Sequence, residues 1–121
     1  KNEVRIASSG LPYVIHFKAS TGKASQIVLP GIPLGLFDDV KYDELTLSLE
    51  PGDVFVFHSD GVTEAWNGDQ EFGTGRLMDL ITTHGTKAPK ELGETVETTL
   101  REWAGDFLAN DDVTFVILRV V

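Results

Sequence analysis

An unbroken apolar run, Val54 to Phe57, most constrains what this chain of 121 residues can fold into. The run follows a Pro51-Gly52 turn and ends at the polar segment His58 to Gly61. Consecutive apolar side chains without alternation are typical of a strand that is covered on both faces. Because such a strand needs neighbours in its sheet and a layer on each side, we expect several packed layers around it.

Further strands are predicted before and after this run. Short β-rich segments at 4–6, 13–17 and 25–29 are separated by Gly, Pro and Ser, and residues 44–49 alternate polar and apolar side chains. Residues 113–121 predict a closing strand, which Asp111 and Asp112 precede.

Between these strands the apolar spacing becomes helical. It predicts one helix near 75–84, which Gly85 ends, and a second that begins at Pro89 and ends at Gly105. The apolar stripe of the second helix is Leu92, Val96, Leu100 and Trp103, and its charged face is Lys90, Glu91, Glu94, Glu97 and Arg101, which we interpret as solvated. We therefore predict one domain, residues 1–121, with an α+β fold and a mostly antiparallel sheet.

The composition excludes several classes of protein. The chain has no cysteine, so disulfides, thiolate metal sites and a cysteine nucleophile are absent. Its net charge of −9 comes without a basic cluster, so we expect no nucleic-acid partner. We also expect no membrane contact and a cytoplasmic location, since no apolar run approaches the length of a membrane span or signal peptide. Residue 1 is Lys rather than Met, which suggests a piece of a longer protein.

Carboxylates stand at matching ends of the two best strands. Asp60 follows strand 54–58, and Asp111 and Asp112 precede the closing strand. If these strands are antiparallel neighbours, the two ends meet, and clustered carboxylates favour a hard divalent cation. Gly61 would leave room for the backbone to turn tightly. The alternative is that Asp60-Gly61 is a bare hairpin turn and Asp111-Asp112 a polar loop.

A different class of metal site is also open. The spacing of Gly52, His58, Asp60 and Glu64 approximates the metal-binding segment of cupin barrels. The downstream region offers only His84 as a further metal ligand, and His84 lies within a predicted helix. Two helices also fit poorly with a jelly roll. We consider His58 itself more typical of a core histidine than of a ligand.

Several segments, in order and spacing, resemble the C-terminal half of a metal-dependent (PPM-type) serine/threonine phosphatase of the sporulation stage II protein E branch. They are Gly31 to Gly35, Leu49 to Asp53, Ser59 to Ala65, Phe72-Gly73 with Arg76-Leu77, and Asp111 to Val116. The opening Ile6 to Pro12 is similar to a family segment in which a histidine usually follows the glycine, but Leu11 stands there in this chain.

The resemblance implies an α/β/β/α sandwich of antiparallel sheets with a two-metal site at one end. Asp60 and Asp111 match catalytic residues that ligate Mn²⁺ or Mg²⁺, and Gly61 and Asp112 would support them without ligating. The implied reaction is attack of a metal-activated water on phosphoserine or phosphothreonine of a partner phosphoprotein, for which an anti-sigma factor antagonist is one candidate.

The upstream ligand segments of such phosphatases do not occur in this chain. We therefore expect a fragment with little or no activity alone, and the alternative is a non-catalytic regulatory or interaction module with the same fold. Loss of half a sandwich would bare an apolar face, which we expect to drive homo-oligomer formation. The face is expected to consist of Leu45, Leu47, Leu49, Val54 and Val56.

Overall fold

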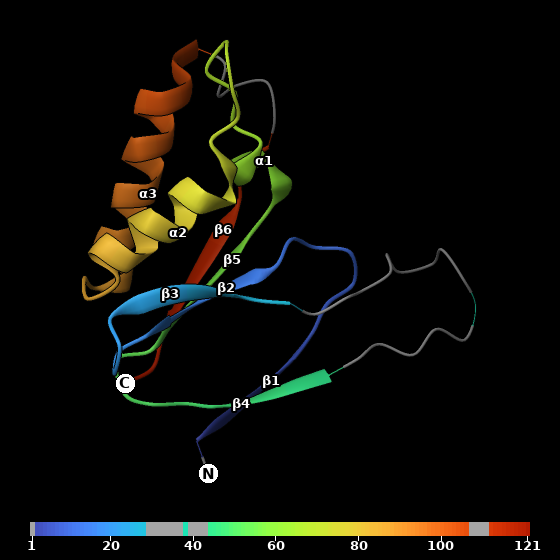
Figure 1. Cartoon of the computed structure of the whole chain (residues 1–121), viewed down its shortest axis with the longest axis vertical. Coiled ribbons are helices and arrows are strands. Elements are labelled where there is room, and N and C mark those ends of the chain that lie inside the picture. The colour runs from blue at the N-terminus through green and yellow to red at the C-terminus, as the bar shows by residue number, and fades with distance from the viewer. Residues whose placement is uncertain (1, 29–37, 39–43, 107–111) are drawn as a thin grey trace.

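The computed structural model describes residues 2–28, 38, 44–106 and 112–121 (Figure 1). The segment Gly31 to Gly35 and the carboxylate of Asp111, both singled out from the sequence, lie outside the described residues. The strands are β1 (Glu3–Ala7), β2 (Val14–Lys18), β3 (Lys23–Ile27), β4 (Glu44–Ser48), β5 (Val54–His58) and β6 (Phe115–Arg119); the helices are α1 (Asp60–Thr63), α2 (Gly73–His84) and α3 (Pro89–Ala104).

The strands form two antiparallel sheets, as predicted. Four strands lie in the order β3-β2-β5-β6, and β1 pairs with β4 in a second, two-stranded sheet. Helices α2 and α3 cover one face of the four-stranded sheet, and the β1–β4 pair lies on its other side (Figure 1). The described residues thus provide one helical layer and two sheet layers of the expected sandwich, and the α+β prediction is confirmed.

The main core lies between the four-stranded sheet and the helices. Strand β5 supplies Val54 and Val56 to it, and α3 supplies the predicted stripe of Leu92, Val96 and Leu100, all almost fully buried. Burial of each such side chain contributes about 1.5–3 kcal/mol to the free energy of folding. The opposite face of α3 is exposed, as predicted, and carries an Arg101–Glu97 ion pair with an N–O distance of 2.7 Å.

A second cluster joins the two sheets. Phe55, on the opposite face of β5 from Val54, packs with Ile6 of β1 and with Val14 and Ile27. Strand β5 is therefore covered on both faces, as its unbroken apolar run predicts. This double cover holds β5 in place between the helices and the second sheet.

The predicted bare apolar face is wrong in its composition. Val54 and Val56 face the helices and are 1% and 0% exposed. The leucines of β4 and its end, Leu45, Leu47 and Leu49, are half-buried against the second cluster. The exposed apolar residues of the four-stranded sheet are instead Val116 and Leu118 of β6, which pairs on one side only, with β5, among the described residues.

The helix boundaries follow local sequence signals. Helix α3 begins at Pro89 and ends before Gly105, as predicted, and α2 begins at Gly73, two residues earlier than its apolar spacing suggests.

Among the described helices, none has both the length and the apolar character that a membrane span requires.

Candidate functional site

The carboxyl end of β5 lies beside the amino end of β6, as the antiparallel arrangement predicts. His58 pairs with Phe115 in the register of the two strands. Beyond the strands, the Ser59 backbone N–H donates to the Thr114 carbonyl oxygen at 2.9 Å, and the Thr114 N–H donates to Ser59 Oγ at 3.0 Å. Ser59 therefore fixes the segment that enters β6 against the segment that leaves β5.

Gly61 allows a close approach between these two segments. It is buried, and a Cβ at this position would overlap the carbonyl oxygen of Asp112. The Ser59 hydroxyl also lies 3.4 Å from that oxygen and donates to it. Any residue larger than glycine would push the Asp112 segment away, so the predicted supporting positions, Gly61 and Asp112, are in direct contact.

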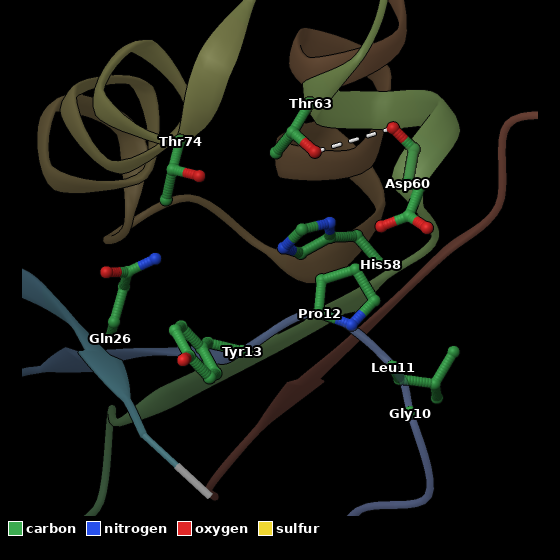
Figure 2. Close-up of a pocket in the computed structure, with 9 residues that line it drawn as sticks. All are labelled: Gly10, Leu11, Pro12, Tyr13, Gln26, His58, Asp60, Thr63 and Thr74. Atoms are coloured by element: carbon green, nitrogen blue, oxygen red, sulfur yellow. Dashed lines mark hydrogen bonds between the residues drawn. The ribbon is translucent and has the colours of Figure 1, made fainter. Parts of the chain in front are cut away.

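Asp60 is the first residue of α1 and is exposed. Its backbone carbonyl accepts from the Glu64 N–H at 2.8 Å and from Thr63 Oγ1 at 3.4 Å (Figure 2). Its side-chain carboxylate has no hydrogen-bond or ion-pair partner among the residues that the structure describes. The reading of Asp60-Gly61 as a bare hairpin turn is wrong, because these residues begin a helix and β6 follows only after α2 and α3.

The donor chemistry at this end suits a hard divalent cation. The open carboxylate of Asp60 supplies oxygen ligands, and the chain brings the Asp112 segment, which follows Asp111, next to Gly61. Among the described residues no group of three or more His, Asp or Glu side chains converges. The described residues thus offer Asp60 as one open carboxylate at this end of the sheet.

A groove of about 420 Å³ opens beside Asp60. Its walls include Tyr13 and Gln26 from the β2–β3 side and Thr63 and Thr74 from the helical side (Figure 2). Sequence analysis included Thr63 in the Ser59 to Ala65 segment but missed Tyr13, Gln26 and Thr74, because they come from three separate segments and form no motif. The one available signal was Tyr13, a large aromatic side chain at the end of a predicted strand.

His58 belongs to the wall of the groove. It is buried, and its Nδ1 lies 3.1 Å from the Ser59 carbonyl oxygen, as expected of a core histidine with a satisfied hydrogen bond. Its imidazole also points into the groove beside Thr63 (Figure 2). His58 is thus both a structural residue and a wall of the groove.

The cupin alternative is wrong. His84, its further ligand, ends α2 and precedes Gly85, which packs against Phe17. Phe17 pairs with Val54, at the end of β5 away from Asp60. The two-sheet sandwich with one helical layer also differs from a jelly roll.

That other end of β5 holds a buried carboxylate of a different kind. Asp53 is 1% exposed and accepts from the Ala19 N–H at 2.9 Å and from the Glu50 N–H at 3.2 Å, and its Oδ2 lies 3.2 Å from His16 Nε2. Burial by itself would raise the pKa of Asp53, but the hydrogen bonds from Ala19, His16 and Glu50 together hold that pKa below its ordinary value. Asp53 joins the turn before β5 to the β2–β3 hairpin.

Comparisons with known proteins agree with this architecture. The sequence is 28% identical over 119 residues to phosphoserine phosphatase RsbU of Bacillus subtilis (strain 168), covering 98% of this chain and 35% of RsbU. The structure is similar to the SiaA-PP2C domain of Pseudomonas aeruginosa, with a TM-score of 0.80, 22% identity, and coverage of 99% of this chain and 47% of that one.

A second solved structure gives the same fold. The phosphatase domain of the cell fate determinant SpoIIE from Bacillus subtilis, presoaked in Mn, aligns with a TM-score of 0.74 and 14% identity, covering 98% of this chain and 50% of that one. The chain thus spans about a third of RsbU and about half of the two solved chains. The sequence profile of Stage II sporulation protein E (SpoIIE) matches residues 1–121, so this chain belongs to the SpoIIE family, as its motifs predicted.

Proposed function

We propose that residues 1–121 are the C-terminal portion of a metal-dependent phosphatase domain that hydrolyses phosphoserine or phosphothreonine on a partner protein. Membership of the SpoIIE family and the similarity to a phosphoserine phosphatase support the reaction. The single structural observation that carries the proposal is the open carboxylate of Asp60 at the point where β5 and β6 meet.

Asp60 and Asp111 would hold a Mn²⁺ or Mg²⁺ ion in this proposal. Hard carboxylate oxygens suit both ions, and the related SpoIIE domain that was presoaked in Mn supports manganese. Bound divalent ions would supply a Lewis acid that acidifies water and neutralises charge on the phosphoryl group. The remaining ligands would come from residues outside this chain. We therefore expect residues 1–121 alone to have little or no activity.

The residues around Asp60 would position it. Ser59 ties the end of β5 to Thr114, and Gly61 lets the Asp112 segment come close. Helix α1 fixes the Asp60 backbone through the bonds to its carbonyl oxygen, so the side chain remains available to a ligand. These contacts would hold two carboxylate-bearing segments side by side without consuming the Asp60 carboxylate.

The substrate in this proposal is a phosphoprotein of a signalling pathway, for which an anti-sigma factor antagonist is one candidate. The printed name of RsbU, a phosphoserine phosphatase, supports the phosphoserine class. We propose that the protein acts in the cytoplasm, where such a phosphoprotein and Mg²⁺ would both be available.

The experiment compares the full-length protein that carries this chain with residues 1–121 alone. Release of phosphate from a phosphoserine protein and from a small aryl phosphate is measured while Mn²⁺ or Mg²⁺ is titrated. We expect metal-dependent turnover by the full-length protein and little by the chain alone. No turnover by the full-length protein with either ion would favour the non-catalytic module, and robust turnover by the chain alone would show that this chain contains a complete site.

We also propose that the isolated chain self-associates through β6. Among the described residues β6 pairs on one side only, with β5, and Val116 and Leu118 are 51% and 50% exposed. An apolar pocket of about 300 Å³ next to them includes Leu11, Phe57 and Val116. An open strand edge beside an apolar surface favours pairing with a second chain.

Light scattering over a range of concentrations tests this association. We expect a dimer or larger assembly for residues 1–121, and a shift toward monomer in Val116→Lys, where a charge replaces a half-exposed valine. Arg5→Lys, a substitution at an exposed residue of β1, serves as the control. A monomer at high concentration would contradict the proposal.

A further inference from the structure

We propose that the groove beside Asp60 binds the uncharged peptide segment that flanks the phosphorylated residue of the substrate. The inference rests on the proposed phosphatase function and adds to it the class of sequence that the site accepts. The groove, of about 420 Å³, starts at Asp60 and extends between Gln26 of β3 and Thr74 of α2 (Figure 2).

One wall of the groove offers an aromatic surface to a bound peptide. Tyr13 is 44% exposed, and with the adjoining Pro12 it forms one wall (Figure 2). Exposed tyrosine rings are enriched where proteins bind other chains, because they bury a large area at low cost in side-chain entropy. This wall would pack against side chains of the bound peptide.

Polar groups suited to a peptide backbone line the rest of the groove. Gln26 offers both an amide donor and an acceptor, and the Thr63 and Thr74 hydroxyls can do either. The Ser59 carbonyl oxygen can only accept, so His58 Nδ1 carries a proton and donates to it. An extended peptide presents alternating N–H and C=O groups that match such a surface.

The charges of the groove argue against acidic flanks. Among the described residues that line the groove, Asp60 and His58 are the titratable groups apart from the Tyr13 phenol, and none is Lys or Arg. Away from the cation proposed at Asp60, an acidic side chain would lose hydration without gaining a cationic partner among these residues. The structure therefore favours alanine-like, threonine-like or other neutral residues beside the phosphorylated one.

The test uses the full-length protein and three probes: p-nitrophenyl phosphate, a phosphoserine peptide flanked by Ala and Thr, and the same peptide flanked by Glu. In Tyr13→Ala we expect kcat/KM for the neutral peptide to fall about tenfold, with p-nitrophenyl phosphate changed less than about twofold; a tenfold loss is typical of removing one aromatic anchor. The wild type should prefer the neutral peptide several-fold over the acidic one. Tyr13→Phe, which keeps the ring, should retain most of the activity.

A second measurement separates this inference from the proposed function. The unphosphorylated neutral peptide is titrated into the full-length protein while the NMR signals of the Gln26 side-chain amide and the Thr74 backbone amide are followed. Chemical-shift changes at both residues that become smaller in Tyr13→Ala support peptide binding in the groove, even if no phosphoester is hydrolysed. A lack of hydrolysis would contradict the phosphatase proposal but not the groove. Where the wild type hydrolyses both probes, equal loss on peptide and aryl phosphate or no loss on either would overturn the groove. The absence of shifts at Gln26 and Thr74 would overturn it whether or not hydrolysis occurs.

Discussion

Two aspartates mark the two ends of β5, and their surroundings differ. Asp53, before the strand, is almost fully buried and holds the Ala19 N–H, the Glu50 N–H and His16. Asp60, just beyond the other end, is exposed, and its carboxylate has no partner in the part of the chain that the structure describes. An aspartate carboxylate thus makes structural hydrogen bonds at one end of β5, whereas at the other end it remains available to a ligand.

This difference separates stability from function along a single strand. His16 stacks on Phe55 with ring centroids 4.4 Å apart, so the Asp53 end is fixed by packing as well as by hydrogen bonds. A rigid end of this kind can hold the opposite end in position while the Asp60 carboxylate remains open to a ligand. We therefore expect substitutions at the two ends to act on different properties.

The largest effect is expected from Asp53→Ala, which leaves two backbone N–H groups and the buried His16 without their carboxylate. Removing one partner of a buried pair costs about 3–5 kcal/mol, a large share of the stability of an ordinary domain. Chemical denaturation of residues 1–121 measures the free energy of unfolding. Asp60→Ala is the matched control and should change that free energy by less than about 0.5 kcal/mol; equal losses in both variants would remove the distinction between the ends.

Asp60→Asn in the full-length protein should lower phosphatase activity and leave stability unchanged. The amide keeps the shape of the side chain but lacks the negative charge that a divalent cation requires, so we expect phosphatase activity to fall at least about 100-fold. Thermal unfolding should stay close to wild type. Glu94→Gln, which removes an exposed carboxylate of α3, is the charge-matched control, and an equal loss of activity there would point to net charge rather than to a site.

Gly61→Ala tests the close approach of the two segments. The added Cβ would overlap the Asp112 carbonyl oxygen, so the backbone must move and the domain should lose about 1–3 kcal/mol of stability. Activity should fall further than stability, since the displaced segment carries Asp111. Activity that follows stability alone would argue that the approach has no role in the site.

Acid should act on the Asp53 end. The pKa of folded Asp53 lies below its ordinary value of 3.8, so the unfolded chain takes up a proton first as the pH falls. The contribution of Asp53 is therefore fully present above roughly pH 4 and is lost as the pH falls through the folded pKa. Denaturation curves at stepped pH should show this loss in wild type and a smaller one in Asp53→Asn; parallel curves would contradict it.

Two glycines of the helical layer should give stability changes of opposite sign, the gain at Gly75 being the smallest effect predicted. In Gly75→Ala, on α2, the new Cβ meets nothing within 4 Å, and we expect a gain of about 0.5–1 kcal/mol. Gly85→Ala would place its Cβ on the Phe17 ring, near the Asp53 end, and should lose about 1–3 kcal/mol. Thermal unfolding distinguishes the two signs, and a destabilised Gly75→Ala would be unexpected.

The sequence predicted what depends on local pattern. The unbroken run of β5 predicted its double cover, Pro89 and Gly105 predicted the limits of α3, and the positions of Asp60 and Asp112 predicted that two strand ends meet. It failed where the answer depends on which faces pack together. Val54 and Val56 were assigned to a bare surface because an unbroken apolar run does not show which layer covers which face of the strand.

The groove could not be predicted for a related reason. Tyr13, Gln26 and Thr74 become neighbours only when the β2–β3 hairpin packs beside α2, a contact between segments far apart in the chain. The network around Asp53 was missed as well, since the sequence suggested only a Pro51-Gly52 turn and gave no sign of His16 beside it. Long-range packing decided both.

Binding of Mn²⁺ to the full-length protein, followed by electron paramagnetic resonance, most directly tests whether the end of β5 and the start of β6 share a cation. Wild type, Asp60→Asn, Asp111→Asn and the control Glu94→Gln are titrated side by side. We predict that each of the two site substitutions weakens Mn²⁺ binding at least tenfold, whereas Glu94→Gln binds as wild type does. Wild-type affinity in Asp60→Asn, with the fold intact, would contradict the account.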